Sequence, residues 1–199
     1  MNWKLLLFVA LISYGAYQSY SKRAVTHGNG VIAGLQPDQD PVQLQADQAE
    51  FNFNGYTIIP LQSFQIEARV LSTKNYSLGR EADLSPVDFA LGWGSMSDEA
   101  ILSKVDISQS NRFYYWHVDE FPIPRRDIET QSANMHMIPA TSQIEKMLKA
   151  VRPGQVVKFS GYLIEAKASD GWHWKSSLSR EDTGNGACEL VFVKALTVN

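Results

Sequence analysis

The stretch QVVKFSGYLIEAK, residues 155–167, decides the fold that this sequence predicts. Its β-branched and aromatic residues are typical of a β-strand, and the stretch is long for one. A glycine inside a strand commonly marks a bend or a bulge, so Gly161 predicts a strand that curves at its middle. A long strand with a glycine at its middle suggests a curved sheet.

Further strands are predicted on both sides of this stretch. In Phe64–Leu71, apolar and polar residues alternate with the period of two that is typical of a half-buried strand. Proline cannot donate a hydrogen bond to a strand ladder, so Pro60 is predicted to separate this strand from an earlier one at Gly55–Ile59. The other predicted strands are Arg112–Val118, Trp172–Leu178 and Cys188–Val193.

Short helices are predicted between the strands. The clearest is Gln143–Val151, where Ser142 and Glu145 form a capping box and apolar residues recur on one face. The sequence SPVD, residues 85–88, has the pattern of a helix start and predicts a helix that ends near Gly92. Two more helices are predicted at Ser97–Glu99 and Arg125–Ser132.

Strands at both ends with short helices between them predict an α+β, β-rich fold. Two architectures satisfy this pattern: a small, partly open barrel of the OB-like kind, or a curved sheet with short helices packed against it. Residues 51–199 are predicted to form a single globular domain. Residues 24–50 are rich in glycine, proline and glutamine and hold no aromatic residue, so they are predicted to be a flexible linker.

Residues 1–23 are predicted to be a membrane anchor. The run Trp3–Tyr20 is apolar with few interruptions, and as a helix it would span about 27 Å of a hydrocarbon core of about 30 Å. No Ala-x-Ala site follows, so an uncleaved signal anchor that contacts the membrane through residues 3–20 is favoured over a cleaved signal peptide. The predicted location is therefore the inner (plasma) membrane, single-pass, with the domain outside the cytoplasm.

The composition excludes several classes of protein. The net charge is −3 with mixed signs, so the sequence predicts no basic surface and no nucleic-acid partner. The single cysteine, Cys188, excludes a disulfide framework and a cysteine-based zinc ribbon. Trp172 and Trp174 share one face of their predicted strand, and core packing explains them better than base stacking.

Cys188 is also the candidate nucleophile of the sequence. A lone cysteine with a histidine beside it in space makes a nucleophile and a base, and His136 and His173 are the two candidate partners. The alternative is a buried structural thiol, which the predicted apolar face of the last strand favours.

Metal binding is disfavoured by the spacing of the histidines. His117, His136 and His173 fit no local metal motif, even when Asp119 or Glu120 is added to them. Neither a metal ion nor another cofactor is therefore predicted.

Four arginines are the candidate binding residues. They lie beside acidic residues in predicted loops or helix starts, and they are Arg80, Arg125, Arg126 and Arg180. One reading is a polar cleft that recognises a charged ligand or partner. The other is a set of salt bridges and caps that fix loops, which is the more common role of such pairs.

Four segments together resemble an uncharacterised family of bacterial single-span membrane-anchored proteins. The segments are Asn75–Pro86, Arg112–Trp116, Ser132–His136 and Gly186–Val191, within a likeness that runs from about Phe51 to Val193. The resemblance implies a bacterial envelope setting, and it brings no known activity, cofactor or site residue.

The function predicted from these features is a membrane-anchored, extracytoplasmic domain that binds an envelope protein partner or a small polar ligand. The absence of a strong catalytic motif disfavours an enzyme. The alternative is nevertheless an envelope enzyme that uses Cys188 with His136 or His173.

Overall fold

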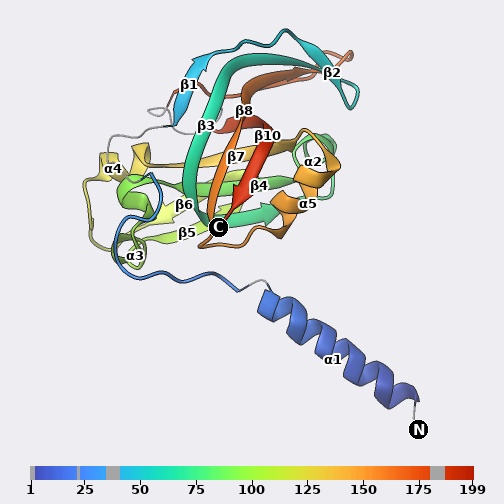
Figure 1. Ribbon diagram of the computed structural model, residues 1–199, viewed down its shortest axis with the longest axis vertical. Coiled ribbons are helices and arrows are strands. Elements are labelled where there is room, and N and C mark those ends of the chain that lie inside the picture. The colour runs from blue at the N-terminus through green and yellow to red at the C-terminus, as the bar shows by residue number, and fades with distance from the viewer. Residues whose placement is uncertain (1–2, 22, 35–40, 180–186) are drawn as a thin grey trace.

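The computed structural model describes residues 3–21, 23–34, 41–179 and 187–199. Within these residues, one mixed sheet of eight strands accompanies a separate two-stranded hairpin (Figure 1). The strands of the sheet are β1 (Val42–Gln45), β2 (Phe51–Phe53), β3 (Tyr56–Asn75), β4 (Val87–Gly92), β7 (Ser132–Pro139), β8 (Val156–Lys167), β9 (His173–Lys175) and β10 (Glu189–Val198). The hairpin strands are β5 (Asp106–Ser110) and β6 (Phe113–His117).

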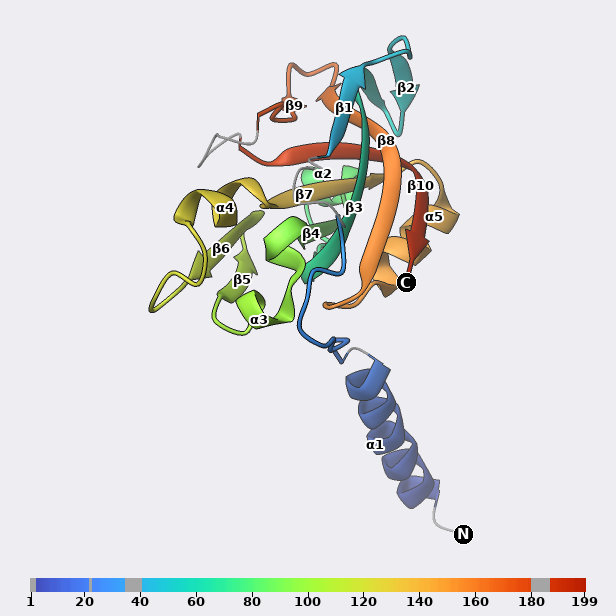
Figure 2. The same cartoon turned by 60° about the vertical axis from the view of Figure 1, so that its left-hand side comes forward.

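Five of the strands pair in a closed ring, in the order β3–β4–β7–β10–β8 and back to β3. β7 and β10 are parallel, and the other pairs of the ring are antiparallel. β3 and β8 curve together along one side of the molecule (Figure 2). The β-rich prediction is confirmed, and the pairing of β3 with β8 that closes the ring was not part of it.

β3 runs unbroken from Tyr56 to Asn75, so the predicted break at Pro60 is wrong. Pro60 pairs opposite Ile164 of β8, and the register shifts between Pro60 and Gln62. A bulge of this kind accommodates a residue that has no N–H to donate, while the ladder continues beyond it. One long strand thereby borders both β4 and β8.

Gly161 lies where the backbones of β8 and β10 approach each other. A Cβ atom at this position would lie 1.8 Å from the carbonyl oxygen of Phe192, which leaves no room for a side chain. The register of β8 against β10 shifts beside it, between Val193 and Ala195. The neighbouring backbone therefore requires glycine at this point of the ring.

The helices are α2 (Arg80–Leu84), the 3-10 helix η1 (Gly94–Ser97), α3 (Glu99–Leu102), α4 (Arg125–Thr130) and α5 (Ser142–Ala150). The helix predicted after residue 85 is wrong, because Val87–Gly92 is the fully buried strand β4. A helix-start pattern acts locally, whereas β4 is held by ladders to β3 and β7 on both sides. α5 begins one residue earlier than predicted, with the Thr141 hydroxyl accepting from the N–H of Ile144.

The main core lies inside the ring, and each of the five ring strands contributes to it. Phe89 of β4, Met135 of β7 and Phe159 of β8 are buried there, and Leu148 of α5 packs against them. Successive side chains of a strand point to opposite faces. The residues between these core positions therefore lie on the outer face of the ring.

The first helix, α1 (Trp3–Ser21), projects away from the sheet in Figures 1 and 2. Among the residues that the structure describes, no helix combines the length and the apolar character needed to cross a membrane. The predicted transmembrane signal anchor at residues 1–23 and the single-pass location in the inner membrane are therefore wrong. The strongly apolar part of the helix, Leu5–Ile12, is shorter than a span requires.

Residues 24–34 lie against the domain, although they belong to the predicted flexible linker. The N–H of Ala33 donates to the Ser97 hydroxyl at 3.2 Å, and the Ala33 side chain is fully buried. Further along, β1 adds to the edge of β3. Residues 35–40 of the predicted linker lie outside the described residues, and the predicted domain boundaries stay predictions.

Candidate functional site

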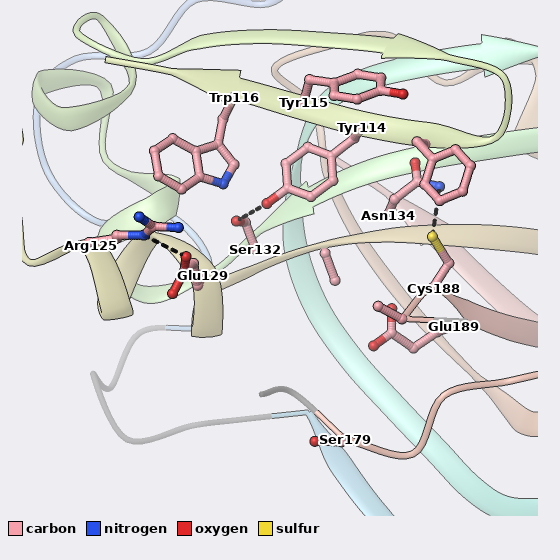
Figure 3. Close-up of a pocket in the computed structure, with 13 residues that line it drawn as sticks. Tyr114, Tyr115, Trp116, Arg125, Glu129, Ser132, Asn134, Ser179, Cys188 and Glu189 are labelled. Atoms are coloured by element: carbon pink, nitrogen blue, oxygen red, sulfur yellow. Dashed lines mark hydrogen bonds and ion pairs between the residues drawn. The ribbon is translucent and has the colours of Figure 1, made fainter. Parts of the chain in front are cut away.

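A pocket of about 360 Å³ lies between the β5–β6 hairpin, α4 and the start of β10 (Figure 3). Four consecutive aromatic residues of β6, Phe113–Trp116, line it. Ser132 and Asn134 of β7 and the thiol of Cys188 line it as well. A cavity of this size and aromatic character takes a small molecule.

Two polar pairs are part of the pocket lining. Arg125 Nε donates to Glu129 Oε1 at 2.8 Å, one turn apart on α4. The hydroxyls of Tyr114 and Ser132 lie 2.7 Å apart and share a hydrogen bond. The pocket therefore offers a bound ligand aromatic surface, two hydroxyls and one charge pair.

Cys188 stands directly before β10 and is half-buried. Asn134 Nδ2 donates to its sulfur at 3.7 Å, and the thiol lies 3.8 Å from the carbonyl oxygen of Arg112, to which it donates. Figure 3 shows the sulfur directed toward Asn134. The thiol therefore has polar neighbours and borders a pocket, in contrast to the apolar surroundings that are typical of a structural cysteine.

His136 and Asp88 lie behind this thiol on neighbouring strands. They are direct partners in the β4–β7 register, and both are buried, with exposed fractions of 4% and 0%. His136 Nδ1 lies 3.0 Å from Asp88 Oδ1. The contact is short but is not aligned as a hydrogen bond, so we treat it as an ion pair.

The pKa of His136 is raised from 6.5 to about 9. Burial alone lowers this pKa, because the protein interior disfavours a charged ring. The carboxylate of Asp88 raises it first and the thiol of Cys188 second, and together they outweigh the effect of burial. At neutral pH the imidazole is therefore protonated, next to Asp88 and Cys188.

Asp88 and His136 are together called the buried group, and Arg112 lies beside them. It donates from Nη1 to Asp88 Oδ1 at 2.7 Å and to the carbonyl oxygen of Ser85 at 3.0 Å. Its guanidinium lies 3.7 Å from the ring centre of Tyr76 and 5.7 Å from that of Trp174.

Trp174 of β9 covers the buried group from outside. Its ring centre lies 4.7 Å from that of His136. His173, the other candidate partner of the thiol, is exposed on β9 and points to the opposite face from Trp174. The structure therefore brings His136, and not His173, to Cys188.

The three predicted arginines that the structure describes do not gather in one place. Arg125 lines the pocket, whereas Arg80 pairs with Asp170 at an exposed site on another part of the surface. Arg126 follows Arg125 on α4 and does not line the pocket. Arg180 lies outside the described residues.

The remaining histidine of the predicted set, His117, is exposed, and its Nε2 atom lies 3.6 Å from Asp119 Oδ1. Across the described ranges, no group of three or more histidine, cysteine, aspartate or glutamate side chains is placed to hold a metal ion.

Three residues of the site escaped the sequence analysis: Asp88, Asn134 and Arg112. The segment around Asp88 was interpreted as a helix start, which gave the carboxylate a capping role. The missed signal is a single charge within the apolar run Val87–Leu91, since a charge in a buried strand needs a partner.

Comparison of the chain with protein-family models, with curated proteins and with solved structures finds no similar protein. No finding bears on the resemblance to bacterial membrane-anchored proteins, and it stays a prediction. Any function must therefore be argued from the pocket and the buried group beside it.

Proposed function

We propose that this chain is an enzyme of the cysteine-nucleophile class, which binds a small molecule in the pocket and attacks it with Cys188. One observation carries the proposal. Asp88 of β4, His136 of β7 and Cys188, which directly precedes β10, lie next to one another, and the thiol of Cys188 lines a pocket large enough for a substrate. A nucleophile, a base and a group that orients the base are the parts that such chemistry needs.

Each member of this group has a role in the proposed reaction. His136 is already protonated at neutral pH, and in the proposed reaction its imidazolium is the counter-ion of the sulfur, which loses its proton to solvent and attacks as a thiolate. Asp88 fixes the ring and balances its charge, as the acidic member of a triad does. Asn134 Nδ2 donates to the sulfur at 3.7 Å and so helps to fix its position.

The pocket wall points to the kind of substrate. The aromatic run Phe113–Trp116 suits a planar or apolar group, and the Arg125–Glu129 pair suits a polar substituent. The substrate that fits is therefore a small molecule with one electrophilic centre near the sulfur and an apolar body against β6.

The second candidate is noncovalent binding of a small polar ligand in the same pocket. The polar pairs in the lining favour it, because they offer hydrogen bonds that need no reactive thiol. Binding of a protein partner stays a prediction that no contact in the structure tests.

Alkylation by iodoacetamide separates these two functions. Cys188 is the only cysteine of the sequence, so mass spectrometry of the intact chain reports this thiol alone. We expect the folded chain at neutral pH to react faster than free N-acetylcysteine. The variant His136→Gln should react about tenfold more slowly, and His173→Gln, the matched exposed histidine, should react like the wild type.

A thiol that reacts only after addition of denaturant would contradict the enzyme and leave noncovalent binding. Equal rates for the wild type and His136→Gln would contradict the role given to the imidazole. Circular dichroism of each variant must first show that it folds.

A further inference from the structure

The turn of the β5–β6 hairpin holds an arginine in an unusual backbone conformation. Asn111 and Arg112 connect the two strands with φ values of 50° and 71°. A two-residue turn with both φ angles positive favours the sequence Asn-Gly, because a side chain at the second position is strained. The backbone at residue 112 therefore favours glycine, and the strain of an arginine there must be offset by stabilising contacts of its side chain.

The side chain of Arg112 makes such contacts with the buried group. It is 13% exposed, and it forms an ion pair of 2.7 Å with the fully buried Asp88. Its guanidinium lies over the ring of Tyr76, with Cζ 3.7 Å from the ring centre. Such contacts place a full positive charge next to the carboxylate that also faces His136.

The charges of the buried group can balance in two ways. With Arg112 present, its charge and that of Asp88 cancel, and the protonated ring of His136 needs a second anion. Leu190 pairs with His136, so Glu189 points to the opposite face of the sheet. The group near the ring that can supply this anion is the thiol of Cys188. Without Arg112, the negative charge of Asp88 balances the positive charge of the His136 ring. A thiolate at Cys188 is then not stabilised, and the thiol keeps its proton.

Other ionisable groups surround this set. Glu81 of α2 lies 3.7 Å from Arg112 Nε, but its side chain is 51% exposed. Glu189 of β10 is buried and lines the same pocket as the thiol. The phenol of Tyr76 has a raised pKa, first through burial and then through the charge of Asp88, so it is neutral at neutral pH.

We propose that Arg112 is a positioning residue that neutralises Asp88 and so leaves the thiolate of Cys188 as the counter-ion of the protonated His136. This inference rests on the proposed function, since it concerns the nucleophile of that same site. It also assigns a reason to the arginine in the hairpin turn. The carbonyl oxygen of Arg112 accepts from Asn134 Nδ2 at 2.8 Å, which ties the same turn to the pocket.

Charge variants of the full chain test this balance, with the alkylation rate by iodoacetamide at neutral pH as the readout. Arg112→Gly suits the backbone of the turn and removes the charge, and we expect a rate about tenfold lower than that of the wild type. The double variant Asp88→Asn with Arg112→Gly removes both charges. It should regain most of the rate, since the ring again lacks any anion except the thiolate.

A merely structural role of Arg112 predicts the opposite order, with the double variant slower than either single one. That order, or a wild-type rate for Arg112→Gly, would overturn the inference. If Arg112→Gly does not fold, Arg112→Lys decides, because it keeps the charge. A rate within about threefold of the wild type supports the balance, and one as low as that of His136→Gln overturns it.

The failure of this inference is distinguishable from failure of the proposed function. If His136→Gln reacts like the wild type, the thiol does not depend on the imidazole and the proposed function fails. If His136→Gln is slow while Arg112→Gly is fast, only the role of Arg112 fails.

Discussion

The two faces of β4 and β7 differ at the point where Phe89 pairs with Met135 and Asp88 pairs with His136. Inside the ring, Phe89 of β4 meets Met135 of β7 in a core of apolar side chains. Outside it, the next residues along, Asp88 and His136, form a buried ion pair. The apolar pair and the ion pair are one residue apart along each strand. The register of β4 against β7 therefore determines both pairs.

The largest expected effect comes from breaking the inner face. Phe89→Ala removes a fully buried ring, and it should lower the free energy of unfolding by about 4 kcal/mol through lost burial and the cavity left behind. Urea unfolding followed by circular dichroism measures this loss. Leu78→Ala is the control, because Leu78 is 90% exposed and its truncation should change stability by less than about 0.5 kcal/mol.

The ion pair on the outer face should make the stability of the fold depend on pH. His136 has a pKa of about 9 in the folded chain against 6.5 as its ordinary value, so its protonated ring stabilises the fold fully below about pH 6.5. This contribution is lost as the pH rises through about 9, and it amounts to on the order of 3 kcal/mol. Urea unfolding at about pH 6 and about pH 10 measures it.

The matching variants isolate this pH effect from that of other groups. His136→Gln should lose the difference between the two pH values, whereas His173→Gln should keep it. A wild-type chain that is more stable at the higher pH would show that the sign is wrong.

A substitution that disturbs the closure of the ring should lower the free energy of unfolding by a smaller amount. Gly161→Ala forces a methyl group against the carbonyl oxygen of Phe192, so β8 and β10 must separate locally. We expect a loss of about 2 kcal/mol by urea unfolding, as for overpacked sites. Gly28→Ala is the control, since open space surrounds that position, and a similar loss there would remove the steric explanation.

The smallest effect is expected in the pocket lining. Arg125→Ala breaks an exposed ion pair with Glu129 and should change the free energy of unfolding by less than about 0.5 kcal/mol. Lys149→Ala, which breaks the comparable pair with Glu145 on α5, is the matched control. A loss above about 1 kcal/mol for Arg125→Ala alone would mean that this arginine fixes the position of α4.

The sequence predicts the β-rich class because its signals are local. Alternation along Phe64–Leu71 and the glycine at residue 161 can be read from neighbouring residues. The pairing of β3 with β8 cannot, because it depends on a register between segments about a hundred residues apart. For the same reason, a helix-start pattern at residues 85–88 was misleading, since two ladders override local preference.

The site was predictable by residue type but not by arrangement. Cys188 and His136 were candidates because thiols and imidazoles carry chemistry, but only the parallel register of β7 and β10 selects His136 over His173. Arg112 carried no signal of its own, since its positive φ angle is a property of the folded turn. The apolar run at the N-terminus misled in another way, because length and composition alone suggested a membrane anchor.

The position of β10 between β7 and β8 has a consequence for the order of synthesis. Asp88 and His136 leave the ribosome well before Cys188, and they can pair as soon as β4 meets β7. The ring closes only when β10 inserts between two strands made earlier, and this same insertion delivers the sulfur. Under the proposed function, the thiol therefore joins Asp88 and His136 only when the fold is nearly complete.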